Sequence, residues 1–379
     1  LFAHSVEYRR LRACVDKDVR RMCRVGEPVP SVRSQGEIIM AFAVDQKVFA
    51  GIDVGAAELV LVLRSGDQSL PAQTFANTAA DHQRLVKKIA ALPGCIVCLE
   101  ATGVYSMDIA LALYDAGILV MVINPKSSCN FAKVLGKHSK TDNVDADTLA
   151  QYGQCMPFKL WTRPTDATIT LRAYSRRIHA LTDQKTASKN QLHAASSVST
   201  TPKTVLHDLK LAITQLEKRL NTLTVAALKH IALHAELSRP LALLIEIKGI
   251  AEASAIALLG ELLLLPSGLT HPQWVKFAGL DPKHFRSGTS VEKKARISKA
   301  GNHYIRAALY MPALSAKRHD PYVSAFFEHL RSKGKTPMQA VCAVMRKLLH
   351  ALHGMLTHNE PFDNTRFYAM PCKNTEVLV

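Results

Sequence analysis

The sequence predicts an α/β domain followed by a mostly helical region, and three observations lead to this division. Up to about residue 158, apolar runs of strand length alternate with helical patterns. Between residues 165 and 237 glycine disappears and leucines recur every three or four residues, which favours long helices. From residue 240 to residue 361 the pattern is again helical but contains a glycine-punctuated hairpin and a very basic loop. We therefore expect an α/β plus all-α protein.

The elements of the first domain follow in chain order. Residues 48–54 and 58–64 are predicted strands separated by the turn-like Gly55-Ala56-Ala57, so a hairpin is expected. A helical pattern at 78–92 precedes a strand at 95–101, a helix near 105–116 precedes a strand at 118–124, and a further helix opens after Pro125. A hairpin followed by strands that alternate with helices predicts an RNase H-like mixed sheet.

Composition narrows the function classes. With 379 residues, 48% hydrophobic and 21% charged, the chain has room for two or three folded domains. Lys and Arg number 48 against 31 Asp and Glu, a formal net charge of +17, which is typical of a protein that binds a polyanion. Nucleic acid is therefore the first expected partner. The most apolar stretch, residues 240–266, is interrupted by four charged residues, so we expect no membrane span.

The cysteines and the N-terminal segment fit a reducing cytoplasm. The eight cysteines follow no disulfide spacing. Cys95 and Cys98 form a lone C-x-x-C in a strand-like apolar run without a second ligand pair, so core packing is favoured over zinc. Residues 1–39 carry no clear period and no secretory h-region. We interpret them as a leader or the product of an upstream start codon, and expect synthesis from Met40 to lose no function.

A heptad pattern marks the middle of the chain. Apolar residues spaced 3, 4, 3, 4 and 3 apart are Leu206, Leu209, Ile213, Leu216, Leu220 and Leu223. The pattern spans about two and a half heptads, fewer than the three or four that indicate a coiled coil from pattern alone. A helix packed inside its own protomer therefore remains the alternative to a coiled coil.

Four acidic residues occupy positions that favour a shared role. Asp53 lies in Gly-Ile-Asp-Val-Gly on the first apolar strand, and Glu100 ends the strand Ile-Val-Cys-Leu-Glu. Asp142 and Asp145 follow in Lys-Thr-Asp-Asn-Val-Asp-Ala, and on a helix their spacing puts both on one face, about 5–6 Å apart. Taken singly, Asp142 could be a helix N-cap and Asp53 a turn residue, while the neighbouring Asp147 is expected to be only solvated.

Together the four acids predict a divalent metal site. Carboxylates gathered at strand and helix ends repel one another, and hard cations bound through oxygen relieve the repulsion. Two Mg²⁺ ions roughly 3.5–4 Å apart can clamp the attacking and leaving oxygens of a phosphodiester. Mn²⁺ could take their place. The set Asp53, Glu100, Asp142 and Asp145 therefore predicts metal-assisted phosphoryl transfer.

The basic loop at residues 283–306 supplies the densest expected phosphate contact, with seven Lys or Arg against one Glu. Within it, Ser287-Gly288 favours an exposed hydroxyl on a turn. A plain turn is the simpler interpretation, because a serine needs a base or metal to become a nucleophile. The predicted nucleic-acid-binding residues, from this loop and two upstream positions, are Lys140, Lys248, Arg286, Lys293, Lys294, Arg296, Lys299 and Arg306.

One upstream turn has two interpretations. Ile247-Lys248-Gly249-Ile250, between two apolar helical runs, resembles half of a helix-hairpin-helix, which can offer backbone N–H groups to a DNA phosphate. A simple helical hairpin explains it equally well.

Taken in order, the motifs of this chain match those of one known family. The matching segments are Gly-Ile-Asp-Val-Gly, Leu-Glu-Ala-Thr-Gly, Val-Ile-Asn-Pro, Phe-Ala-Lys, Lys140-Thr-Asp-Asn-Val-Asp-Ala, Phe277-Ala-Gly-Leu-Asp-Pro, Ser287-Gly, Ser298-Lys-Ala-Gly and Leu309-Tyr-Met-Pro-Ala. From about residue 48 to residue 362 the sequence resembles the DEDD transposases of bacterial insertion sequences, a group that includes the Piv-type DNA invertases. The turn at Gly249 departs from the stronger Gly-Ile-Gly form of hairpin, which leaves its phosphate-binding role open.

The resemblance implies a RuvC-like N-terminal domain, a helical coiled-coil middle and a helical C-terminal transposase domain. We accordingly expect a leader at 1–39, the catalytic DEDD domain at 40–158, the coiled-coil region at 159–238, the transposase domain with its serine at 239–365 and a tail at 366–379.

The resemblance also implies roles for residues and partners. It assigns catalytic and metal-binding roles to Asp53, Glu100, Asp142 and Asp145, and the role of nucleophile to Ser287. It implies a homo-oligomer, dimer or tetramer, whose composite sites join the carboxylates of one protomer to the serine of another. A noncoding bridge RNA would select donor and target DNA. The implied reaction is attack by Ser287 on a DNA phosphodiester, giving a phosphoserine link and then a Holliday-junction-like intermediate, in a bacterial cytoplasmic protein associated with the nucleoid when active.

Three rival functions remain open at the level of sequence. A RuvC-type Holliday-junction nuclease would use the same carboxylates with water as nucleophile. An actin-like sugar kinase shares the Gly-Ile-Asp-Val-Gly strand, but Ala56 replaces the usual Thr or Ser and no second glycine-rich phosphate motif follows. A non-catalytic DNA or RNA binder would not need Asp142 at all.

Overall fold

The computed structural model describes residues 48–103, 105–137, 141–287 and 291–369, with only the backbone described at Ser287 and at residues 291–294. These residues divide at Arg163 into two compact units, 48–163 and 164–369. The expected leader at 1–39 and most of the expected tail lie outside the described residues. The sequence predicts that the first domain ends near residue 158 and that separate middle and C-terminal regions meet near residue 238. In the structure the first unit ends at Arg163, and residues 164–369 form one unit.

The first unit is built on one mixed sheet. Its strands are β1 (Phe49–Val54), β2 (Glu58–Ser65), β3 (Gln68–Ser69), β4 (Gln73–Ala76), β5 (Ile96–Glu100) and β6 (Leu119–Ile123). They lie in the order β3-β2-β1-β5-β6, with β4 also paired to β2. The β1–β2 pair is antiparallel, whereas β1–β5 and β5–β6 are parallel. A hairpin that continues into parallel strands is the RNase H-like arrangement, so the predicted fold class is confirmed.

Among the described residues of the first unit there are four helices, and each predicted helix is present. They are α3 (Ala79–Ala90), α4 (Met107–Asp115), α5 (Pro125–Val134) and α6 (Asp142–Cys155). The sequence places a capping side chain before three of them. Thr78 accepts a hydrogen bond from the Asp81 N–H, Asn124 caps α5 and Thr141 caps α6. A side chain that satisfies a free N–H at a helix start fixes where the helix begins.

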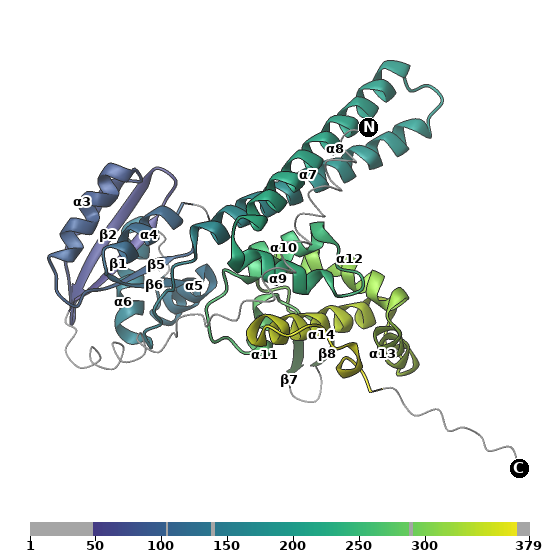
Figure 1. Ribbon diagram of the computed structural model, residues 1–379. Helices are drawn as coiled ribbons and strands as arrows, with labels where there is room; N and C mark the ends of the chain where they lie inside the picture. The colour runs from purple at the N-terminus through teal and green to yellow at the C-terminus, as the bar shows by residue number, and fades with distance from the viewer. Residues whose placement is uncertain (1–47, 104, 138–140, 288–290, 370–379) are drawn as a thin grey trace, which may run out of the picture. The chain divides into compact units, whose positions relative to one another are not determined.

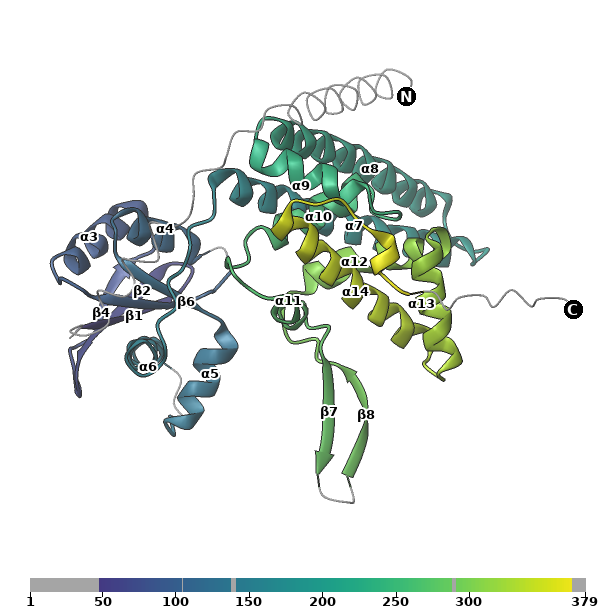
Figure 2. The same ribbon diagram turned by 60° about the horizontal axis from the view of Figure 1, so that its bottom comes forward.

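Alternation along β1 decides which residues face which helices. Ala50 and Ile52 are buried with Leu85 of α3 and Leu113 of α4 on one face of the sheet. The intervening residues face the opposite side, which α6 covers (Figure 2). Asp53 is therefore on the side of α6.

The second unit is mostly helical, and its elements follow one another along the chain. They are α7 (Asp166–Ser196), α8 (Lys203–Ala232), α9 (Ala235–Ile245), α10 (Glu252–Leu262), α11 (His271–Phe277), β7 (Pro282–Ser287), β8 (Val291–Ile297), α12 (His303–His319), α13 (Pro321–Ser332), α14 (Pro337–His358) and the 3₁₀ turn η2 (Asn364–Arg366). Helices α7 and α8 form a long helical hairpin, called here the arm (Figure 1). Its base is continuous with the C-terminal helices, because one apolar cluster extends from Ala167 to Phe367.

The heptad pattern of α8 is used inside the chain. Leu216 and Leu220 are buried in the same cluster as Ile178 and Leu181 of α7. The structure thus shows the alternative in which this helix packs within its own protomer, as half of a two-helix hairpin.

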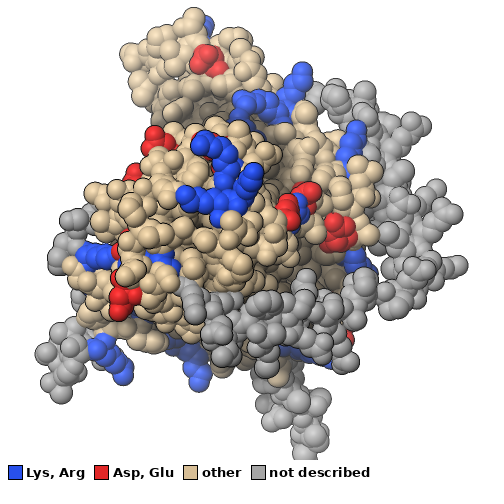
Figure 3. All heavy atoms as spheres, turned by 90° about the vertical axis from the view of Figure 1, so that its left-hand side faces the viewer, with Lys and Arg blue, Asp and Glu red and all other residues tan. Residues whose placement is uncertain are grey.

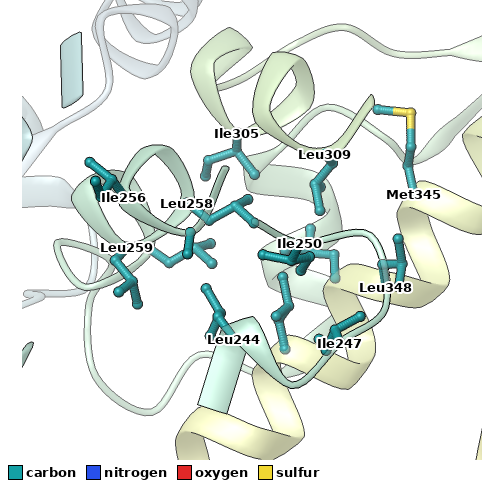
Figure 4. Packing of buried hydrophobic residues seen from close by; sticks show 14 of the residues in the cluster. Leu244, Ile247, Ile250, Ile256, Leu258, Leu259, Ile305, Leu309, Met345 and Leu348 are labelled. Carbon is teal, nitrogen blue, oxygen red and sulfur yellow. The ribbon is translucent and has the colours of Figure 1, made fainter. Parts of the chain in front are cut away.

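The core of the second unit gathers residues from helices far apart in sequence. Figure 4 shows Leu244, Ile250 and Leu258 beside Leu309 and Leu348. Burying an aliphatic side chain of this size stabilises the fold by about 1.5–3 kcal/mol. Among the described residues, no helix is both long and apolar enough to cross a membrane.

The predicted basic loop is largely an antiparallel ribbon. Strands β7 and β8 pair from Pro282 opposite Ile297 to Ser287 opposite Val291, with a register shift after Lys283. Figure 2 shows the ribbon extending away from the helices of its unit. Ser287 is the last residue of β7, so it lies at the distal end of the ribbon.

Candidate active site

The first of the four acids, Asp53, lies near the carboxyl end of β1 and is partly buried. It shares a sheet face with Gly51, because residues two apart on a strand point the same way. A Cβ atom at Gly51 would lie 1.9 Å from the Ala146 carbonyl oxygen and 2.4 Å from the Ala150 nitrogen. Helix α6 therefore contacts β1 backbone to backbone at this glycine.

This contact sets the position of α6 along β1. The other glycine of the interface, Gly153, lies against Cys98 and Phe49, so α6 runs opposite to β1. From Gly51 to Asp53 is about 6.6 Å along the strand, at about 3.3 Å per residue. The same distance is four to five residues of helix at about 1.5 Å each. The first turn of α6, which carries Asp142 and Asp145, is thereby placed beside Asp53.

Electrostatics confirm that the acids share one neighbourhood. Burial and, after it, the nearby carboxylates of Asp145, Asp142 and, less strongly, Glu100 together raise the pKa of Asp53 to about 6. A hydrogen bond from the Val54 N–H opposes the shift. Burial is the largest cause of the raised pKa, and the neighbouring negative charges add to it. The structure brings together all four acids that the sequence singled out.

Glu100 enters the site from the neighbouring strand. The parallel register pairs Ile52 with Leu99. Asp53 and Glu100 are the next residues on the two strands, so both lie at the same edge of the sheet. The Ser128 hydroxyl donates to Glu100 Oε2 at 2.5 Å. Ser128 is 8% exposed and comes from α5, which the Asn124 cap starts just after β6. This contact orients the Glu100 carboxylate, and no sequence pattern predicts it.

Asp147 corrects one prediction from the sequence, since it is held by protein groups and is not simply solvated. Its carboxylate accepts from Arg64 Nη1 at 2.7 Å, Lys137 Nζ at 2.7 Å, Ser69 Oγ at 3.0 Å and Gln151 Nε2 at 3.0 Å. These hydrogen bonds outweigh burial and lower its pKa. Arg64 and Ser69 belong to β2 and β3, so Asp147 fastens the start of α6 to the sheet.

The donor set of four carboxylates suits a hard divalent cation, which prefers oxygen ligands. The raised pKa of Asp53 is the strain that such a cation would relieve. No three Asp, Glu, His or Cys side chains of the described residues form a finished metal-binding group. The structure therefore places the four carboxylates in one neighbourhood, but it does not arrange them as a set of metal ligands.

The cysteine pair does not take part. Cys95 and Cys98 are 4% and 0% exposed, and burial raises the pKa of both thiols to about 12. A thiol that stays protonated is a poor metal ligand. Core packing, the favoured interpretation, is confirmed.

The predicted phosphate-binding residues differ in how they are placed. Exposed side chains are those of Lys248, Arg286, Arg296 and Lys299. Lys140 and the side chains of Lys293 and Lys294 lie outside the described residues, as does the side chain of Ser287.

Arg306 is a part-buried member of this set. Its Nη1 donates to the Ala278 carbonyl at 2.9 Å and the Gly301 carbonyl at 3.3 Å, and burial lowers its pKa. Its guanidinium thus braces the chain after β8 from within the unit.

The turn at Gly249 packs against the protein. This residue has φ +107°, and a Cβ there would lie 2.9 Å from both the Ala316 nitrogen and the Pro312 oxygen of α12. The glycine therefore lets α12 approach closely. A simple helical hairpin explains its presence without a DNA phosphate.

Charge is divided unequally between the units. Residues 48–163 contain 10 Lys and Arg and 10 Asp and Glu, whereas residues 164–369 contain 28 against 14. On the side where Figure 1 draws β2 and α3, Lys and Arg stand in small separate groups among uncharged residues (Figure 3). The second unit therefore carries most of the attraction for a polyanion.

Known protein families and proteins resemble this chain over much of its length. A DEDD transposase model of the IS110 type matches residues 50–196, and the transposase IS116/IS110/IS902 family matches residues 241–328. The pilin gene-inverting proteins of Moraxella bovis and Moraxella lacunata are each 32% identical over 269 residues, which cover 70% of this chain and 81% of theirs. Thermus thermophilus RuvC in complex with a Holliday junction substrate is 15% identical, covering 28% of this chain and 95% of that one, with a TM-score of 0.23.

Proposed function

Because this chain belongs to the IS116/IS110/IS902 family of transposases and is thus an enzyme of the DNA transposase and recombinase class, we propose that it cuts and rejoins DNA at the ends of an insertion sequence by metal-assisted phosphoryl transfer. The observation that supports this proposal is the placement of Asp53 and Glu100 at one edge of the sheet, beside the first turn of α6 that carries Asp142 and Asp145. Such a site has little use in a protein that only binds DNA.

The carboxylates of Asp53, Glu100, Asp142 and Asp145 would hold the metal, which we propose to be Mg²⁺, two ions with Mn²⁺ as a substitute. When bound, a divalent cation neutralises phosphate charge and favours the deprotonated form of an attacking hydroxyl. The protein's own part is to fix the acids. Gly51 admits α6, Asp147 fastens it, and Ser128 orients Glu100.

Ser287 is the proposed nucleophile. Its hydroxyl attacks the phosphorus of a phosphodiester, the bond to the leaving sugar oxygen breaks, and that oxygen takes up a proton. The phosphoserine link conserves the energy of the broken bond for rejoining. The position of Ser287 at the distal end of a basic ribbon supports this role, because such a ribbon can approach a DNA backbone closely.

The carboxylates and the serine lie in different units of the chain. We propose a homo-oligomer, dimer or tetramer, in which the acids of one copy act with the serine of another. The positive charge of residues 164–369 suits both proposed nucleic acids, the DNA ends and target and a noncoding bridge RNA that selects them. The active protein would then associate with the bacterial nucleoid.

The test of the serine is covalent capture. Purified protein is incubated with labelled element-end DNA and Mg²⁺, and protein–DNA adducts are separated under denaturing conditions. Ser287→Ala is expected to abolish the adduct and strand transfer, while Ser332→Ala, at an exposed serine of α13, is expected to leave both unchanged. Cleavage that survives Ser287→Ala would instead support hydrolysis by a RuvC-type junction nuclease.

The test of the carboxylates separates binding from chemistry. Asp142→Asn is expected to lower cleavage at least 100-fold with DNA affinity retained. Asp108→Asn is the matched control, because Asp108 also lies in the first turn of a helix of the same unit. Full activity of Asp142→Asn would favour a protein that binds nucleic acid without cutting it.

A further inference from the structure

We propose that Glu261 is a positioning residue that holds the base of the β7–β8 ribbon against helix α7 through Asn302, and so sets the direction in which Ser287 is presented. The use of that direction rests on the proposed function; the mechanical link does not. The ribbon base is defined here as Asp281 together with residues 298–302. The Glu261 cluster is defined as Arg172, Arg176, Glu261 and Asn302.

Glu261 is a charge buried among apolar side chains. It is 2% exposed, and its neighbours on α10, Leu258, Leu259 and Leu262, are all part of the core. A carboxylate in such a place is costly unless it is paired and hydrogen-bonded. Arg176 Nε donates to Oε1 at 2.7 Å and Nη2 to Oε2 at 3.3 Å, while Arg172 Nε lies 3.7 Å from Oε1. Both arginines come from α7.

The remaining partner comes from the ribbon base. Asn302 Nδ2 donates to Glu261 Oε2 at 2.6 Å. With its other side-chain atom, Oδ1, Asn302 accepts from the N–H groups of Tyr304 and Ile305 and caps α12. Its backbone N–H donates to the Phe277 carbonyl at 2.7 Å. One residue therefore joins the end of the ribbon, the start of α12 and the buried carboxylate.

The ribbon base is closely determined by local contacts. Ser298 Oγ donates to Asp281 Oδ1 at 2.5 Å, which ties the residue after β8 to the residue before β7. The Lys299 N–H donates to the Gly279 carbonyl, and Lys299 has φ +52°, an uncommon conformation for this residue type. A two-stranded ribbon has little stability of its own. Its direction is consequently set where it is attached.

Helices α10 and α7 also pack closely beside the Glu261 cluster. A Cβ at Gly260 would lie 2.7 Å from the Ser175 Cβ, so α10 and α7 touch there. The Arg176 guanidinium lies 4.6 Å from the centre of the ring of Tyr304, the second residue of α12. Glu261 thus sits at the junction of the arm and the ribbon base. Replacing a buried ion pair by apolar residues of similar volume often leaves a protein equally or more stable. We therefore infer that the charge of Glu261 serves to orient the ribbon base.

Asn302 offers a way to cut the link without losing the helix cap. Asn302→Ser keeps a capping oxygen, since Ser and Asn rank alike at this position, but removes the donor to Glu261. We expect amide hydrogen exchange at Ser298, Lys299 and position 302 to quicken about tenfold. Exchange in the buried part of α14 should stay unchanged, and DNA affinity should be retained while adduct formation slows about tenfold.

A double variant that exchanges the Asn302 amide and the Glu261 carboxylate is expected to restore the link. Asn302→Asp sets a second carboxylate against Glu261 and is expected to loosen the base more than Asn302→Ser does. The double variant E261Q/N302D swaps amide and carboxylate, so one hydrogen bond and one negative charge remain beside Arg176. We expect its exchange and adduct rates to return to within about threefold of the unaltered protein.

Two outcomes would overturn the proposal. Either the ribbon base exchanges at the original rate in Asn302→Ser, or α14 loosens as much as the base does, which would mean a general loss of stability. Failure of the proposed function gives a different result. In that case the exchange pattern and its rescue persist, although Ser287→Ala leaves the chemistry intact.

Discussion

Replacing Gly51 by alanine tests how the acids are brought together. The new Cβ would lie 1.9 Å from the Ala146 oxygen, whereas an ordinary contact for such an atom begins near 3.4 Å, so α6 must retreat by about 1.5 Å. Both opposing atoms are backbone, and no side-chain rotation can relieve the overlap. Overpacking of a core costs about 1–3 kcal/mol, and we expect about 3 kcal/mol here because the backbone must move.

The same displacement should harm catalysis. It carries Asp142 and Asp145 away from Asp53, and a shift of about 1 Å at a reacting group can lower a rate about 100-fold. We expect Gly51→Ala to reduce DNA cleavage by about that factor. The pKa of Asp53 should move down from about 6, because the carboxylates that raise it are farther away and its burial is reduced. The pKa can be followed by NMR titration of the metal-free protein.

Gly153→Ala is the matched control in the same helix. A Cβ there would lie 3.4 Å from the Cys98 Cβ and 3.7 Å from Phe49 Cδ1, so it fits. Replacing a glycine inside a helix then stabilises the fold by about 0.5–1 kcal/mol. Amide exchange in β1 and α6 measures each change without assuming that the two units unfold together. Equal protection in both variants, or full activity of Gly51→Ala, would refute the reasoning.

Three further predictions concern ionisable side chains that are buried or partly buried. The pKa of Asp53 is higher in the folded state than its ordinary value of 3.8, so metal-free protein should lose stability as pH rises from about 4 to about 6. Asp53→Asn should remove this pH dependence of stability in urea titrations. At pH 7, millimolar Mg²⁺ should stabilise only the unaltered protein. Burial lowers the pKa of His350 from 6.5 to about 4, so the second unit should lose stability as pH falls through that range, and His350→Gln should flatten the loss in exchange measurements on α14. Asp147→Ala leaves Arg64 and Lys137 without their shared carboxylate and should cost about 1–3 kcal/mol, seen as faster exchange in α6 with a matching loss of cleavage.

The candidate acids could be found from the sequence because each stands where its segment disfavours a charge. Asp53 interrupts an apolar strand and Glu100 ends one, while Asp142 and Asp145 begin a helix behind the Thr141 cap. The convergence of parallel strand ends at one sheet edge then makes their meeting an expectation. Periodicity carries this information, since alternation along a strand and capping of a helix are local properties.

Asp147, Ser128 and Glu261 could not be found in this way. Their partners lie far along the chain: Arg64 is 83 residues from Asp147, Glu100 is 28 from Ser128, and Arg176 is 85 from Glu261. Asp147 and Ser128 stand among other polar residues of their helices, and Glu261 interrupts an apolar run that does not show which groups pair with it. For a related reason the sequence predicts a loop where the structure has a ribbon, because the pairing joins two short strands with irregular register.

The amino-acid order by itself determined the sequence of strands and helices, the excess of positive charge and the identity of the four acids, because hydrophobic alternation, helix caps and charge are carried by neighbouring residues. Tertiary structure alone decided how closely α6 lies on β1 at Gly51, which partners hold Asp147 and Glu261, and that the heptad seam of α8 is covered by α7. Those outcomes depend on backbone approaches and hydrogen bonds between distant segments, whose free energy exists only once the whole core has packed.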